Sequence, residues 1–167
     1  LLIASAIIFT VPFYLIWNEQ AFRDEQVNHL WFFPLFLAGI VAHELLHGIG
    51  WSLYAKNGWK SISFGVMWKM LTPYCHCNEP LGKRPYMIGA LMPLVVLGII
   101  PAIVSLLIGN VVLLVWGIMF IAAAAGDIWM AWLLHKEDSE STILDHPNEA
   151  GFYVFPKEDI NTPTKKE

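Results

Sequence analysis

Four long apolar stretches, almost free of charge, constrain the fold of this chain more than any other feature. Three of the four have the roughly 20 residues that a helix needs to cross a bilayer, and the first is close to that length. Hydrophobic residues make up 56% of the 167 residues and charged residues 14%, against about 45–50% and about 25% in soluble domains. We therefore expect an all-α membrane protein embedded in a lipid bilayer, with about four transmembrane helices at residues 1–17, 30–54, 86–108 and 111–134.

Other classes of protein fit the sequence poorly. A soluble fold would need four helices without a polar face to be buried in one small domain. The net charge of −4 gives no basic stripe, so a nucleic-acid partner has no support. The two cysteines, Cys75 and Cys77, are one residue apart, which excludes a disulfide framework.

Positive charge predicts the orientation in the membrane. Nine of the ten Lys and Arg residues lie in the loop 55–85 or after His135, and only Arg23 lies in the opposite loop. Because cytoplasmic segments carry the excess of Lys and Arg, we predict a cytoplasmic loop and tail. The domains are then a transmembrane domain, residues 1–135, and a polar cytoplasmic tail, residues 136–167, whose end we expect to be disordered. Within the loop, residues 61–66 alternate small or polar with apolar side chains, which predicts a short strand or hairpin between the second and third helices.

The second stretch contains the motif His43-Glu44-Leu45-Leu46-His47. On a helix, His43 and His47 lie one turn apart on the same face, so both imidazoles can bind one metal ion, with Glu44 beside its open position. Such a site holds Zn²⁺, whose bound water attacks a carbonyl while the glutamate takes the proton. The alternative is that the three residues only pack, but ionisable side chains at membrane depth are costly without a compensating partner.

A catalytic zinc site needs a third protein ligand. Asp127 is the only acid in the last apolar stretch, and its depth from the cytoplasmic helix end matches that of the histidines. We prefer Asp127 to Glu79, His76 and His146, because loop and tail residues reach that depth only by folding back into the bilayer. A single Cys75-His76-Cys77 segment lacks a second ligand pair, which favours a structural or substrate-contacting role.

Three segments together resemble a known family. The segments His43-Glu44-Leu45-Leu46-His47-Gly48, Thr72-Pro73-Tyr74-Cys75-His76-Cys77-Asn78-Glu79-Pro80-Leu81 and Gly126-Asp127 are similar to motifs of a bacterial family of small membrane proteins, formerly a domain of unknown function, described as zincin peptidases. The likeness covers about residues 30–155 and extends to site-2-protease-like intramembrane metalloproteases. It implies His43, His47 and Asp127 as zinc ligands and Glu44 as the catalytic base.

The resulting hypothesis is an intramembrane zinc metalloprotease that hydrolyses peptide bonds of membrane-protein substrates. A non-catalytic metal-binding membrane scaffold or sensor is the alternative; it would need the ligands but not the base Glu44. A metal transporter would want polar residues on several helices, and the stretch 86–108 has no charged residue.

Overall fold

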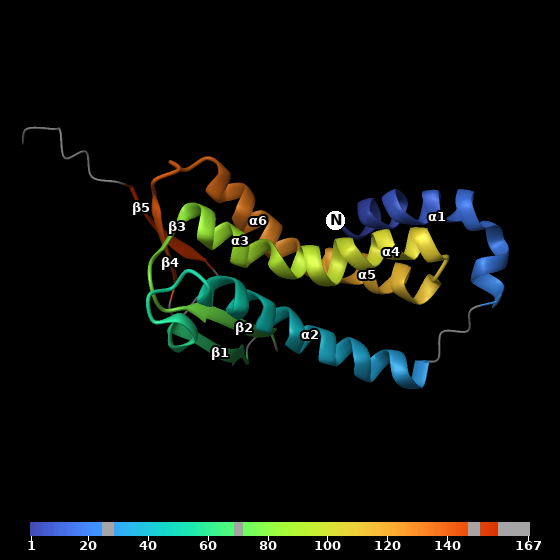
Figure 1. Cartoon of the computed structure of the whole chain (residues 1–167), viewed down its shortest axis with the longest axis horizontal. Coiled ribbons are helices and arrows are strands. Elements are labelled where there is room, and N and C mark those ends of the chain that lie inside the picture. Colours follow the sequence, from blue (N-terminus) through green and yellow to red (C-terminus); the bar gives the residue numbers. More distant parts are fainter. Residues whose placement is uncertain (25–28, 69–71, 147–150, 157–167) are drawn as a thin grey trace, which may run out of the picture.

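The computed structural model describes residues 1–24, 29–68, 72–146 and 151–156. It is mostly helical, with five short strands gathered at one end of the molecule (Figure 1). The expected disordered end of the tail lies outside the described residues. The helical elements are α1 (Leu2–Asp24), α2 (His29–Ser52), a 3-10 turn (Gly58–Ser61), α3 (Lys83–Pro93), a π-helical turn (Leu94–Ile99), α4 (Ile100–Ile108), α5 (Val111–Ala123) and α6 (Ala125–His135).

Three helices are long and apolar enough to cross a membrane: Leu2–Phe22, Leu30–Ser52 and Lys83–Ile108. The last span differs from the expectation of one helix over residues 111–134. It is divided into α5 and α6, which are bent by 49° at Ala124. Asp127 lies in the first turn of α6, directly after the bend.

Two boundaries also differ from those expected. Helix α1 runs beyond residue 17 to Asp24, through a kink at Asn18, whose φ of 58° lies in the left-handed region that asparagine tolerates better than most residues. The third membrane-length helix begins at Lys83 rather than at residue 86. Its start is defined by tertiary contacts, since the Lys83 ammonium donates to the carbonyls of His135 and Glu137 at the end of α6.

Helices α2 and α3 pack closely through glycine. A Cβ atom added to Gly50 would lie 2.6 Å from the Cα of Gly89, so the two backbones touch, as small residues permit in membrane helices. This contact brings the carbonyl of Gly89 beside the motif helix.

Strands β1 (Ile62–Met67) and β2 (Thr72–Cys77) form an antiparallel hairpin in which Phe64 pairs with Cys75. The short strand or hairpin expected here is present. A second sheet was not expected: β3 (Leu81–Gly82), β4 (Thr142–Asp145) and β5 (Phe152–Phe155) pair in the order β3-β4-β5. The tail is thereby joined to the loop that precedes α3.

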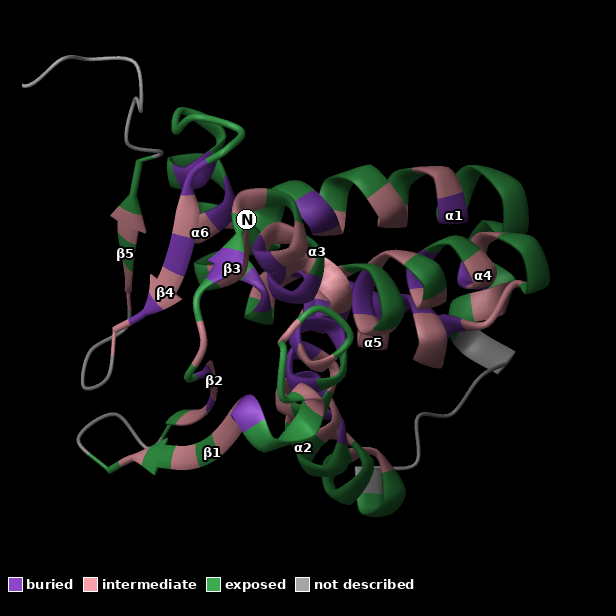
Figure 2. Ribbon diagram, turned by 60° about the vertical axis from the view of Figure 1, so that its left-hand side comes forward, coloured by how far each residue is buried: buried purple, intermediate pink, exposed green. Residues whose placement is uncertain are grey.

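Buried residues lie where the helices meet the two sheets and also between α1 and α5, and many outward faces of the helices are exposed (Figure 2). The exposed side chains include large apolar ones, such as Ile3 at 76% and Leu30 at 81%. Contiguous apolar surface of this kind marks contact with a membrane or a partner rather than with water. One core cluster joins α2, α3, α6 and both sheets; its buried members are Trp51, Cys75, Cys77, Leu81, Tyr86, Ala90, Leu134 and Ile143.

Candidate metal centre

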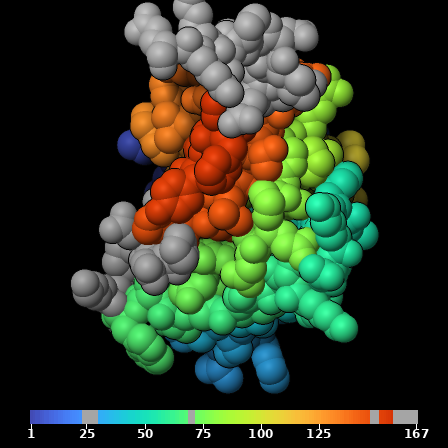
Figure 3. All heavy atoms as spheres, turned by 90° about the vertical axis from the view of Figure 1, so that its left-hand side faces the viewer, coloured from blue at the N-terminus to red at the C-terminus, as the bar shows by residue number. Residues whose placement is uncertain are grey.

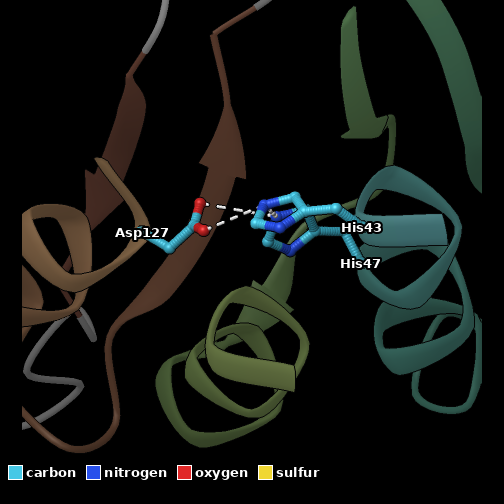
Figure 4. Close-up of side chains that lie close together, drawn as sticks. All are labelled: His43, His47 and Asp127. Atoms are coloured by element: carbon cyan, nitrogen blue, oxygen red, sulfur yellow. Dashed lines mark hydrogen bonds and ion pairs between the residues drawn. The ribbon is translucent and has the colours of Figure 1, made fainter. Parts of the chain in front are cut away.

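Two helices bring three potential ligands together. His43 and His47 lie one turn apart on α2 and point the same way, and Asp127 faces them from α6 (Figure 4). The histidines are 8% and 5% exposed, respectively. Among the described residues, no other group of three His, Cys, Asp or Glu side chains comes close enough to hold one metal ion.

The distances between the ligand atoms suit a tetrahedral ion. Nε2 of His43 lies 3.2 Å from Nε2 of His47. The Asp127 carboxylate lies 3.2 Å from the first of these nitrogens and 3.4 Å from the second. Ligand atoms held about 2.0–2.1 Å from a tetrahedral zinc ion are about 3.3–3.4 Å apart. The three side chains therefore already have the spacing of zinc ligands.

The hydrogen bond of His47 determines which of its ring nitrogens can bind a metal ion. Its Nδ1 lies 3.0 Å from the backbone carbonyl of Gly89, and because a carbonyl can only accept, Nδ1 carries the proton and donates it. In the neutral ring, Nε2 is left with a lone pair directed at His43 and Asp127. A second-shell hydrogen bond of this kind is the usual arrangement for a metal-ligating histidine.

The neutral Nε2 of His47 and the Asp127 carboxylate thus meet as acceptors in a buried place. Oδ2 of Asp127 is buried and makes no hydrogen bond with any described residue. A cation bound between these two acceptors would satisfy both of them together. The residues present therefore fit a zinc ion, and no rearrangement of the backbone is needed.

Aromatic rings hold the histidines in place. The Trp51 ring stacks on His47, with centroids 5.2 Å apart and planes 15° from parallel. Trp51 is itself fixed by its indole N–H, which donates to the carbonyl of Tyr86 at 2.9 Å. On the other side, the Phe120 ring lies 6.5 Å from His43 at 28°. One aromatic ring thus packs on each imidazole.

Glu44 borders two cavities at this place. One, of about 260 Å³, is lined by the three potential ligands together with polar groups such as His76 and Asp145. The other, of about 280 Å³, also reaches His43 and Glu44 but is lined by Phe36, Ile40 and Phe120. The Glu44 carboxylate therefore stands beside the potential ligands and next to space for another molecule.

The other sequence candidates lie apart from the three ligands. Glu79 accepts a hydrogen bond from the side chain of Asn57, and the His146 ring packs on Tyr153. His76 borders the polar cavity but packs on Tyr74. Cys75 and Cys77 are buried in the core cluster, and burial raises the pKa of both thiols.

Residues of the loop and of the tail reach the candidate metal centre. Residues Thr72 to His76 of β2 border the cavity, as does Asp145 of the tail. One edge of the β2 backbone pairs with β1, and the backbone N–H of Cys77 donates to Asp145, so these polar groups have partners within the protein. Asp145 was missed by the sequence reasoning, since a single acid in a polar tail carries no local signal of burial.

A family model described as "Putative zincin peptidase" matches residues 35–142, well over half of the chain. The chain belongs to this family. The matched region contains His43, Glu44, His47 and Asp127, and the resemblance to the zincin peptidase family is confirmed. Searches of curated proteins and of solved structures gave no match. Membership supports a zinc-dependent metallopeptidase as the broad functional class.

Proposed function

We propose that this protein is an intramembrane zinc metalloprotease, related to the site-2 proteases, that hydrolyses peptide bonds of membrane-protein substrates. His43, His47 and Asp127 are the zinc ligands and Glu44 is the catalytic base. The observation that carries the proposal is the meeting of two imidazoles and a carboxylate from α2 and α6 at the spacing of tetrahedral ligands, with a glutamate on the wall of the same cavity.

A bound zinc ion supplies Lewis acidity, which polarises the substrate carbonyl and makes water a better nucleophile near neutral pH. The protein does the rest. The Glu44 carboxylate accepts a proton as the water oxygen bonds to the carbonyl carbon, and it returns that proton to the amide nitrogen as the C–N bond breaks. The carboxylate ends the cycle ionised, as it began.

The membrane character of the substrate is supported by the two cavities. The cavity of about 280 Å³ has Phe36, Ile40 and Phe120 in its lining, which suits an apolar side chain next to the scissile bond. The polar cavity next to it suits peptide that has left its helix. The three membrane-length helices and the bent pair α5–α6 support a site within a membrane protein. We further propose that the loop and tail face the cytoplasm.

The variant Glu44→Gln tests the catalytic role. Glutamine keeps the shape of the side chain but cannot accept the proton, so zinc content should stay at the wild-type level while cleavage falls at least about 100-fold, the lower end of the contribution of a general base. The measurement is zinc content together with cleavage of a panel of single-span membrane proteins in liposomes.

Two outcomes would count against the enzyme. Cleavage by Glu44→Gln at the wild-type rate would remove the role given to Glu44. A wild-type protein that binds zinc and cleaves no substrate of the panel, under conditions where the zinc is retained, would favour the scaffold or sensor instead.

A further inference from the structure

Asp145, at the end of β4, is an acid buried beside the metal centre. It is 8% exposed and borders the polar cavity that also contains His43, Glu44 and His47. One carboxylate oxygen accepts a hydrogen bond from the backbone N–H of Cys77 at 2.8 Å, and the other accepts one from the hydroxyl of Tyr86. Asp145 lies beyond the residues that the family model matches.

These two hydrogen bonds join three separate segments at one point. Cys77 belongs to β2, Tyr86 to α3 and Asp145 to the tail. Figure 3 shows the C-terminal strands covering the centre of one face, beside the segments of the hairpin and of α3. A carboxylate is suited to this junction, since it offers two acceptor oxygens to two donors that would otherwise be buried unpaired.

From this junction a continuous set of contacts leads to a zinc ligand. The ring of Tyr86 stacks on Trp51, with centroids 5.4 Å apart and planes 28° from parallel. Trp51 stacks in turn on His47 and donates to the Tyr86 carbonyl. The position of the Tyr86 ring thus sets the position of Trp51, which fixes the orientation of the His47 imidazole.

We propose that Asp145 is a positioning residue that fastens strand β4 of the tail to β2 and α3 and holds the Tyr86–Trp51 stack against His47. Strand β4, which follows the last helix, then supports the metal centre. As far as it concerns zinc, the inference rests on the proposed function.

The test compares three variants in the full chain. Asp145→Ala removes both acceptors and should weaken zinc affinity about tenfold, the lower end of the effect of losing an outer-shell partner. Asp145→Asn should restore affinity to near the wild-type level, because its amide oxygen accepts from Cys77 and its amide nitrogen donates to the Tyr86 oxygen. Ile143→Ala is the structural control: it truncates a fully buried side chain on the same strand and should lower the melting temperature without changing zinc affinity.

Zinc affinity is measured by chelator competition, and hydrogen exchange of the segment 72–77 is measured on the metal-free protein. Asp145→Ala should speed that exchange more than Ile143→Ala does. The inference is overturned if Asp145→Ala binds zinc as the wild type does, if Asp145→Asn gives no rescue, or if Ile143→Ala weakens zinc binding as much. A wild-type protein that binds no zinc would refute the proposed function instead. Hydrogen exchange of the segment 72–77 would then be the remaining test of the role of Asp145. Equal exchange rates in Asp145→Ala and Ile143→Ala would show that Asp145 does not hold β4 to β2 and α3.

Discussion

Asp127 is the one potential ligand of the three that comes from α6, whereas His43 and His47 both lie on α2. Asp127→Ala should weaken zinc binding by more than the 10- to 100-fold that loss of an outer-shell partner costs, because it removes one of three protein ligands. Zinc affinity of the purified protein, measured by chelator competition, checks this. The matched controls His76→Ala, Glu79→Ala and His146→Ala should keep zinc bound, since these side chains pack elsewhere or only border the cavity. Zinc loss from a control, with Asp127→Ala unaffected, would reassign the third ligand.

These residues differ in how far the sequence could reveal them. A fixed spacing on one helix identifies His43, Glu44 and His47 in the sequence. Asp127 is identified because it is the one acid in an apolar stretch. Asp145 has neither signal. Its burial arises only when β4 pairs with β3, about 60 residues earlier in the chain, and no local pattern encodes that pairing.

At the scale of elements, the contact between α2 and α3 supports the centre. A Cβ atom on Gly89 would lie 2.2 Å from the Trp51 ring, so Gly89→Ala must displace the ring that stacks on His47. We expect a loss of about 1–3 kcal/mol of stability from overpacking, together with weaker zinc binding. Gly126→Ala is the control, since a Cβ there meets no atom within 4 Å. Thermal unfolding with and without zinc checks both; a Gly89→Ala protein as stable and as zinc-saturated as the wild type would show that the contact is not needed.

Local sequence patterns predicted the apolar helices and the hairpin, but they did not predict the bend between α5 and α6 or strands β4 and β5. Apolar length predicted about four transmembrane helices, for which the structure has three membrane-length helices and one bent pair, and alternation over residues 61–66 predicted β1. The 49° bend at Ala124 was missed because the stretch is uniformly apolar on both sides of it. Strands β4 and β5 have only four residues each, too few for a reliable period, and are held by tertiary pairing.

For the whole molecule, the predicted topology places the loop 55–85 and the tail on the cytoplasmic side. Single cysteines introduced as Lys60→Cys and Ile108→Cys lie on opposite sides in this arrangement, and both positions are exposed. The native thiols give little background, because both are buried and burial raises the pKa of each. A membrane-impermeant maleimide should label Ile108→Cys in intact cells and Lys60→Cys only after lysis. The reverse pattern would invert the topology.

The central claim is that one zinc ion is bound by two imidazoles and a carboxylate between α2 and α6. X-ray absorption at the zinc edge of the purified wild-type protein tests this most directly, because it reports the atoms around the metal. The expected spectrum has only nitrogen and oxygen neighbours, at about 2.0–2.2 Å, including two histidines. Sulfur neighbours at about 2.3 Å would instead place the zinc on Cys75 and Cys77 and contradict the account.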